Sequence, residues 1–398
     1  MSEPSKPTAT ISTTAPSGHV TAVFLGSAPF VLINFGLPLR ADDLGVDAVG
    51  IGFMYTLFTG AMLVFRPLVG AALDRYGRRW FFVSAFGFYA ASMAVFARSV
   101  DVIDFYVART LQGVGAALMW VSARTIIADL YDLKERGGAM GRMAAASAQG
   151  SMVGATFGFT LLGFLPFAQA WMWAFSGYAV LAVLALLWSW WKVNETRSPA
   201  PQQTSSVNWR ALLSRAPVRR LFVIVFLSMF GSALIEPIYL LYLKNKYDVG
   251  VMLLAWVFLP AGVVFAILPR YAGNWSDRFG RAPLIATGVC FAGLVSAALP
   301  FWPSLWMIAV SYVLFSIGWA VASPAEDALV ADLAPADLRG TLIGAKEAAG
   351  GLGAATGPLL GGYIYEYHAQ EAAFVVNGVI LLITAFLALL WFREQALR

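Results

Sequence analysis

The chain has few charged residues, one cysteine and two histidines, and each shortage excludes a class of protein. Charged residues make up 12% of its 398 residues, whereas a soluble globular domain has about 25%. The single cysteine, Cys290, excludes a disulfide scaffold and lies in an apolar run, as expected of a buried thiol. The histidines, His19 and His368, cannot form a metal cluster by themselves. We therefore expect neither a metal site nor an ordinary water-soluble domain.

Long apolar runs take the place of charge. Hydrophobic residues make up 59% of the chain, and its mean hydropathy is +0.71. A membrane-spanning helix needs about 20 mostly apolar residues. Twelve such spans are predicted, at residues 20–38, 48–68, 80–98, 103–129, 140–163, 170–191, 217–243, 250–269, 282–301, 305–330, 342–364 and 371–392. The predicted fold class is an all-α integral membrane protein, with the lipid bilayer as a partner.

A polar stretch divides the twelve spans into two groups of six. Residues 193–215 are rich in Pro, Ser and Gln, so we expect a cytoplasmic linker between six-helix bundles at 19–192 and 216–392. Residues 1–18 are rich in Ser, Thr and Pro and lack the pattern of a signal peptide. We expect a disordered cytoplasmic tail there and a second short tail at 393–398.

The basic residues gather on one side of the predicted bundle. Of 27 Lys and Arg residues, 20 fall on the side of the N-terminus and three within spans; only Arg40, Arg98, Lys244 and Lys246 fall on the other side. The positive-inside rule then places both termini in the cytoplasm. This bias also explains the pI of about 9.3 without nucleic acid. The expected location is a plasma membrane, and the compact loops favour a bacterial inner membrane.

The two halves repeat in register. Adding 203 to the residue number carries Asp74 onto Asp277, Gly77 onto Gly280, Arg78 onto Arg281 and Asp129 onto Asp332. The same offset carries Gly150, Gly154 and Gly158 onto Gly353, Gly357 and Gly361. A constant offset indicates a duplicated six-helix unit, whose copies pack about an axis along the membrane normal.

Two motifs add a family resemblance. The loop after the second span reads G-x-x-x-D-R-x-G-R-R from Gly70 to Arg79, and the fourth span contains R-x-x-Q-G-x-G-A from Arg109 to Ala116. With the repeat and the twelve spans, these motifs make the chain resemble the major facilitator superfamily, in particular its drug–proton antiporters. The resemblance implies two pseudo-symmetric six-helix bundles that alternate access to a central site, without a cofactor. We expect a monomer.

The two glycine-punctuated loops are predicted to be gates. The residues given this role are Gly70, Asp74, Arg75, Gly77, Arg78 and Asp129 in the first half, and Gly273, Asp277, Arg278, Gly280, Arg281 and Asp332 in the second. Asp129 is expected to pair with Arg78, and Asp332 with Arg281. The resemblance further implies that Asp74 docks at the N-terminus of span 11. The first loop should be the stronger latch, since Ala282 replaces Arg79 in the second copy. Alternatively, these are ordinary topology charges.

Glycines recur every four residues in spans 5 and 11. Span 11 reads GAATGPLLGG from Gly353 to Gly362, but span 5 has Ala155 and Phe159 where the antiporters of the family carry proline and glycine. This departure weakens the assignment to the antiporters. We expect both glycine ladders to serve close helix packing.

Two helix faces are predicted to line a central cavity. The residues concerned are Arg109, Gln112 and Trp120 on span 4 and Tyr312, Phe315 and Trp319 on span 10, with Tyr239 on span 7. The alternatives are structural pairing for Arg109 and ordinary packing for the aromatic residues.

Glu236 and Asn34 are polar residues within spans 7 and 1. Glu236 precedes Pro237, about two turns from the outer end of its span. A carboxyl group in a membrane favours its neutral form, so we expect Glu236 to bind and release a proton during transport. The alternative is an acid neutralised by hydrogen bonds at a kink. Asn34 is a second polar candidate for the cavity.

Arg124 and Asp327 differ by 203 and so occupy equivalent positions near the cytoplasmic ends of spans 4 and 10. They are predicted to pair, with Glu326 as the alternative acid, and to close the cytoplasmic gate when the cavity opens outward. Arg66 either faces the cavity or extends to the membrane surface.

The sequence contains neither a phosphate-binding loop nor a Ser/His/Asp set, which predicts a transporter rather than an enzyme. The predicted function is export of a small amphipathic compound in exchange for protons. The alternatives are a proton symporter or uniporter for a sugar, amino acid or organic anion, and a membrane sensor that moves no substrate.

Overall fold

The structure is a computed structural model that describes residues 18–197, 214–250, 267–333 and 339–392, with residues 253, 254, 257, 260, 261, 263 and 264. Its helices are α1 (Gly18–Gly26), α2 (Phe30–Asp43), α3 (Ala48–Tyr76), α4 (Arg79–Ala97), α5 (Val102–Leu130), α6 (Leu133–Phe164), α7 (Phe167–Lys192), α9 (Ala216–Tyr247), α11 (Pro269–Phe279), α12 (Arg281–Ala298), η1 (Leu299–Phe301), α13 (Leu305–Leu333), α14 (Arg339–Tyr367) and α15 (Ala372–Phe392). The two predicted tails, except Gly18, and most of the predicted linker lie outside these residues.

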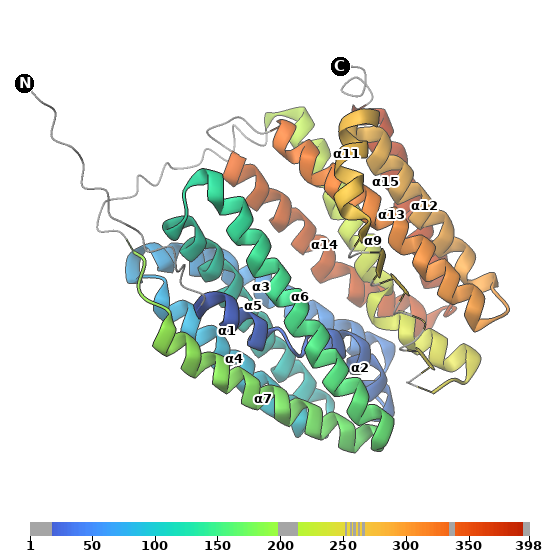
Figure 1. Cartoon of the computed structure of the whole chain (residues 1–398). Helices are drawn as coiled ribbons and strands as arrows, with labels where there is room; N and C mark the ends of the chain where they lie inside the picture. The colour runs from blue at the N-terminus through green and yellow to red at the C-terminus, as the bar shows by residue number, and fades with distance from the viewer. Residues whose placement is uncertain are drawn as a thin grey trace, which may run out of the picture.

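The helices form a bundle of two halves, α1–α7 and α9–α15, with α14 at the boundary (Figure 1). Since α1 and α2 follow one another as a single span, the described helices correspond to eleven of the predicted spans, and much of the predicted span 250–269 lies outside the described residues. The all-α membrane fold is confirmed. We name the end where α1 begins and α15 ends the terminal end, and the end with the α2–α3 and α14–α15 turns the distal end.

Within the described residues, nine helices have the length and apolar composition needed to cross a membrane. Helices α6 and α14 are not among them, because their glycine and charged residues lower their hydropathy. Both are nevertheless long, with 32 and 29 residues, or about 48 and 44 Å. Both begin before the predicted spans 140–163 and 342–364, at the terminal end, and each has at least one charged residue in its first turn.

The first span is interrupted, where the sequence predicts one continuous helix. It breaks between Gly26 and Phe30, at Pro29, which has no N–H to donate. Inside a membrane the backbone groups at such a break must find partners within the protein. The carbonyl of Ser27 accepts hydrogen bonds from the backbone N–H of Phe30 at 3.2 Å and from the hydroxyl of Ser151 on α6 at 2.9 Å. Helix α6 therefore stabilises the break.

The glycine ladders bring helix backbones together in both halves. A Cβ atom at Gly154 of α6 would lie 1.9 Å from the carbonyl oxygen of Ala28, and one at Gly361 of α14 would lie 1.8 Å from that of Leu234 on α9. No side chain fits at such distances, so the predicted close packing is confirmed. The same pairing occurs in each half, span 5 on span 1 and span 11 on span 7, as expected for a duplication.

The two halves meet mainly along α3 and α14. A Cβ atom at Gly52 would lie 2.2 Å from the carbonyl oxygen of Pro358, and the Thr59 hydroxyl lies 3.3 Å from that of Ala354. A buried apolar cluster crosses the boundary at the distal end; it includes Leu39, Ile51, Leu240, Leu243 and Tyr365. The distal end is therefore closed by apolar packing.

Candidate functional site

The first gate loop centres on a buried arginine. Gly77 ends α3 with φ of 95°, a conformation that favours glycine. The next residue, Arg78, is only 2% exposed, and its Nε lies 3.0 Å from Asp129 Oδ2. Its other guanidinium nitrogens lie 3.6 Å from Asp74 and 3.0 Å from the carbonyl oxygen of Leu73. The predicted pairing of Arg78 with Asp129 is confirmed.

The second loop repeats this geometry with more exposure to solvent. Gly280 has φ of 90°, and Arg281 Nε lies 3.0 Å from Asp332 Oδ2, as predicted, with Asp277 as its second partner. The Arg281 side chain is 24% exposed, against 2% for Arg78. This difference agrees with the expectation that the first loop is the stronger latch, which stays a prediction.

Sequence reasoning missed Glu195, which clamps the first loop. Its carboxylate accepts hydrogen bonds from the backbone N–H groups of Arg78 at 2.9 Å, Arg79 at 3.2 Å, Thr196 at 3.0 Å and Arg197 at 2.9 Å. Partial burial raises the pKa of the Glu195 carboxyl, but these four bonds outweigh it and hold the pKa below its ordinary value. The start of the predicted linker is therefore bound to the first glycine loop.

Further contacts join the linker to the loop. Thr196 Oγ1 donates to Asp129 Oδ2 at 2.9 Å, and Arg197 donates to the carbonyl of Arg75 at 2.7 Å. A Cβ atom at Gly77 would lie 2.3 Å from Glu195 Oε2, so glycine makes room for the clamp. An acid directly after an apolar run is a weak sequence signal, and the polar composition of residues 193–215 concealed it.

At the terminal end, ion pairs cross from the first half to α14. Arg66 Nη1 lies 3.3 Å from one carboxylate oxygen of Glu347, and Arg124 Nη1 lies 2.6 Å from the other. Arg66 thus faces the other half.

On the second half, Lys346 contacts both Glu326, at 3.7 Å, and Asp327. The predicted partners Arg124 and Asp327 each contact another residue here, and their pairing in an outward-open state stays a prediction. Glu347 was detectable as an acid within a predicted span.

At the distal end, ion pairs also join the halves. Lys244 Nζ on α9 lies 2.8 Å from Asp42 and 3.1 Å from Asp43 at the end of α2. The backbone N–H of Ala48 donates to Glu366 Oε2 on α14 at 3.1 Å. The sequence places these residues in turns on one side, but only the fold brings them together.

Arg109 lies buried between α5 and α3. It is 2% exposed; its Nε donates to the carbonyl of Met54 at 3.2 Å and its Nη1 to Gln112 Oε1 at 2.8 Å. Its guanidinium group stacks over the rings of Tyr55 and Phe58, at 4.8 and 4.5 Å from their centroids. Arg109 and Gln112 therefore pack within the first half, and their lining of a cavity stays a prediction.

Glu236 faces the boundary between the halves. It is exposed at mid-helix, whereas its neighbours Ile235 and Pro237 are buried. Its carboxylate is close enough to interact electrostatically with Arg109 and Tyr55 of the first half. Asn34 is exposed too, and its carbonyl accepts a hydrogen bond from the Tyr55 hydroxyl at 3.1 Å. These residues come from α2, α3, α5 and α9.

The predicted aromatic residues fall into two places. The rings of Tyr239 and Tyr312 lie 5.3 Å apart near Glu236, with Phe315 partly buried against the same cluster. Trp319 is 8% exposed and packs in the core of the second half, whereas Trp120 packs at the edge of the core of the first. The structure therefore brings the two tyrosines to the acid.

The remaining loop residues play smaller parts in this conformation. A Cβ atom at Gly70 would meet nothing within 4 Å, so Gly70 makes no close contact with a neighbouring helix in this conformation. Arg75 and Arg278 lie over the rings of Tyr76 and Phe279. Gly273 lies within α11.

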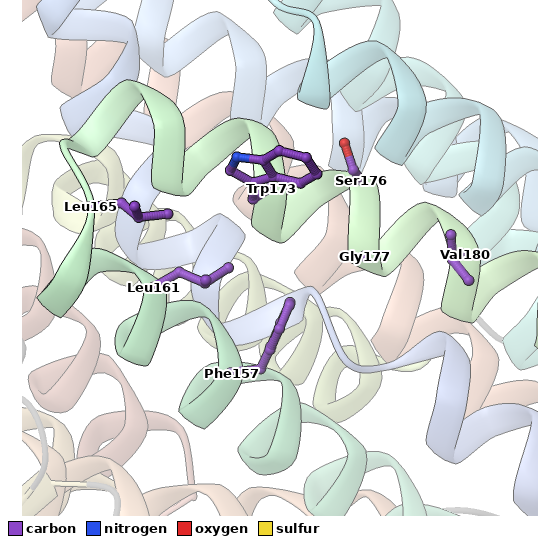
Figure 2. Close-up of a pocket in the computed structure, with 7 residues that line it drawn as sticks. All are labelled: Phe157, Leu161, Leu165, Trp173, Ser176, Gly177 and Val180. Atoms are coloured by element: carbon purple, nitrogen blue, oxygen red, sulfur yellow. The ribbon is translucent and has the colours of Figure 1, made fainter.

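A groove of about 520 Å³ lies between α6 and α7 on the outside of the bundle (Figure 2). Its lining residues are Phe157, Leu161, Leu165, Trp173, Ser176, Gly177 and Val180. The single hydroxyl, on Ser176, donates to the carbonyl of Met172 at 2.7 Å. The groove is therefore suited to hydrocarbon and offers no polar recognition.

Comparisons with known proteins agree with this arrangement. The chain matches the family model described as Major Facilitator Superfamily over residues 20–270 and 221–397. It is 24% identical to multidrug resistance protein 2 of Bacillus subtilis, over 95% of this chain and 94% of that protein. It is 22% identical to the quinolone resistance protein NorA of Staphylococcus aureus, over 91% and 92%. The crystal structure of a bacterial homolog of the human lysosomal transporter Spinster, inward-facing and occupied, has the same fold, with a TM-score of 0.77, 16% identity, and coverage of 94% of this chain and 96% of that one.

Proposed function

Because the chain belongs to the Major Facilitator Superfamily of transporters, we propose that it exports a small amphipathic compound in exchange for protons. Residues 19–192 and 216–392 act as two halves that alternate access to a site between them. The relatives in Bacillus subtilis and Staphylococcus aureus, described as multidrug and quinolone resistance proteins, support export as the direction of transport.

Glu236 carries the proposal. It is an exposed acid at the boundary between the halves, within electrostatic range of the buried Arg109. A proton on Glu236 removes its attraction for Arg109, and a cationic substrate replaces the proton by neutralising the carboxylate. Proton and substrate thus compete for one carboxylate, which is the requirement for exchange. The paired rings of Tyr239 and Tyr312, and Asn34 beside Tyr55, supply aromatic and polar contacts for the substrate.

The ion pairs at the two ends are the gates of the cycle. The Lys244 pairs with Asp42 and Asp43 hold the distal end closed in the present conformation. The predicted pair of Arg124 and Asp327 closes the terminal end in the opposite conformation, together with the two glycine loops. The terminal end, with both termini, faces the cytoplasm because the basic residues gather there.

Flux into proteoliposomes tests the function. Protein reconstituted as a monomer should accumulate a fluorescent amphipathic cation such as ethidium when an imposed pH gradient drives exchange. Glu236→Gln should abolish the dependence on the gradient, since the amide cannot release a proton. Glu371→Gln changes an exposed distal acid and serves as the control.

Two outcomes would contradict the proposal. Flux through the unmodified protein that is independent of the pH gradient would favour a uniporter. Flux of substrate and protons in the same direction would favour a symporter. A pH dependence that survives in Glu236→Gln would remove Glu236 from the coupling step.

A further inference from the structure

We propose that Arg66 and Arg124, the arginine pair, form a binding site for the carboxylate of an amphipathic anion, and that Glu347 occupies this site in the present conformation. The inference deepens the proposed transport function and rests on it for the movement of the two halves. It adds a class of ligand that Glu236, as an acid, does not recognise.

Glu347 shows which ligand the arginine pair accepts. Arg66 and Arg124 contact different oxygens of its carboxylate, at 3.3 and 2.6 Å. Guanidinium groups that converge on both oxygens of one carboxylate make the charge-assisted contacts by which proteins recognise carboxylates. The side chain of Glu347 is therefore an internal stand-in for a carboxylate ligand.

The arginine pair needs an anion between its members. The two guanidinium groups converge on one carboxylate and therefore lie close to each other, so their positive charges repel. The neighbouring acids Glu326 and Asp327 contact Lys346 on their own half. When the second half moves away, Glu347 and these acids leave with it, and an anion from solution can then neutralise the pair.

The arginines and the internal carboxylate belong to different halves. Arg66 is on α3 and Arg124 on α5, and these helices pack closely: a Cβ atom at Gly113 would lie 2.4 Å from the carbonyl oxygen of Phe58. The two arginines should therefore move together. Glu347 is on α14 of the second half, so separation of the halves at the terminal end withdraws it and frees the site.

The surroundings indicate an amphipathic ligand. One turn toward the middle of the membrane from Arg66 and Arg124 lie Met62 and Trp120, both partly buried apolar residues of the first half. A carboxylate on the arginine pair would place an attached hydrocarbon chain against them. The side chains of Arg66 and Arg124 are 27% and 49% exposed, so the site is reachable from the terminal end.

Binding of labelled decanoate to the purified protein in nanodiscs at pH 8 tests the inference, with empty nanodiscs as the blank. Glu347→Gln removes the competing carboxylate and should tighten decanoate binding about tenfold or more, because one charge-assisted hydrogen bond is worth at least that factor. In that background, Arg66→Ala or Arg124→Ala should abolish the gain. Arg142→Ala, at an exposed arginine of α6, should leave it unchanged.

The head group and a second variant keep the test decisive. Decanol and decyltrimethylammonium share the chain of decanoate and should compete poorly with it. Glu347→Asp shortens the internal ligand by one methylene and should bind decanoate with intermediate affinity, which guards against misfolding of Glu347→Gln. Unchanged affinity in both variants, or equal competition by decyltrimethylammonium, would overturn the inference. Neither result depends on a pH gradient, so the proposed exchange reaction is tested separately.

Discussion

Arg78 illustrates how a single charge is kept within this bundle. A buried guanidinium group loses its hydration and must recover that free energy from partners. Arg78 has Asp129, Asp74 and a backbone carbonyl, whereas the equivalent Arg281 stays partly in water. The two equivalent arginines therefore differ in how much they contribute to the stability of the fold, because one is buried and the other is partly exposed.

Arg78→Ala should destabilise the protein more than Arg281→Ala. Removing Arg78 leaves Asp129 without its main cation in a buried setting, which costs about 3–5 kcal/mol, whereas loss of a partly exposed pair costs about 1 kcal/mol or less. Thermal unfolding in detergent measures the two variants side by side. Equal shifts in Tm would contradict the asymmetry of the two loops.

The Glu195 clamp should weaken in acid. Because its folded-state pKa lies below the ordinary value of 4.5, the clamp contributes stability above pH 4.5 and loses it as the pH falls through the folded-state pKa. Hydrogen exchange of the Arg78 and Arg79 amides, followed at each pH and corrected for the intrinsic exchange rate, reports release of the clamp. In Glu195→Gln these amides should exchange faster at every pH, without the acid step. An acid step of the same size in the variant would assign it to another group.

Among the elements, α6 and α14 depend most on residues that lack side chains. Their glycines bring backbones into contact with α1, the turn that follows it, α3 and α9. Such contacts replace the hydrophobic effect, which does not drive association between helices in lipid. The same small residues lower the apolarity of these two helices, so the feature that packs them also weakens their signal as membrane spans.

Gly154→Ala should disrupt the packing of α6 on the first span. The added Cβ would lie 1.9 Å from the carbonyl oxygen of Ala28, so the backbones must separate, at a cost of about 1–3 kcal/mol for overpacking. Gly141→Ala, in the same helix with no neighbour within 4 Å, should be neutral or stabilising. The free energy of unfolding in detergent compares the two. A Gly154→Ala variant as stable as Gly141→Ala would mean that the helices are not in contact.

The whole molecule is held differently at its two ends. Apolar packing and the Lys244 pairs join the halves distally, whereas exposed ion pairs to Glu347 join them terminally. In an alternating cycle the tightly packed end must change from the distal to the terminal end and back. The reason is that the halves cannot be tightly packed at both ends while a substrate enters.

Lys244→Ala should loosen the distal end. On a Cys290→Ala background, Leu39→Cys places a thiol in the distal apolar cluster, where residue 39 is fully buried. Loss of the Lys244 pairs should make the thiol at residue 39 react several-fold faster with a maleimide in nanodiscs. Lys246→Ala is the matched control, because Lys246 contacts Tyr242 and Pro300 of its own half. Equal rates in the two variants would show that Lys244 does not hold the halves together.

The fold class and the pairing of the two loop arginines with Asp129 and Asp332 could be predicted from the amino-acid sequence alone. These follow from local chemistry: apolar runs of membrane length, glycines at positive φ, and a repeat that places equivalent residues in equivalent surroundings. The glycine ladders belong to the same group, since small residues at a four-residue spacing share one helix face.

The contacts between distant segments could not be predicted from the sequence and became visible in the folded arrangement. Arg124 contacts Glu347 rather than Asp327, Glu195 clamps a loop far away in sequence, and the first span breaks at Pro29. The physical reason is that such pairings depend on how two bundles are placed against each other. That placement changes with the transport cycle, and no periodicity along the chain encodes it.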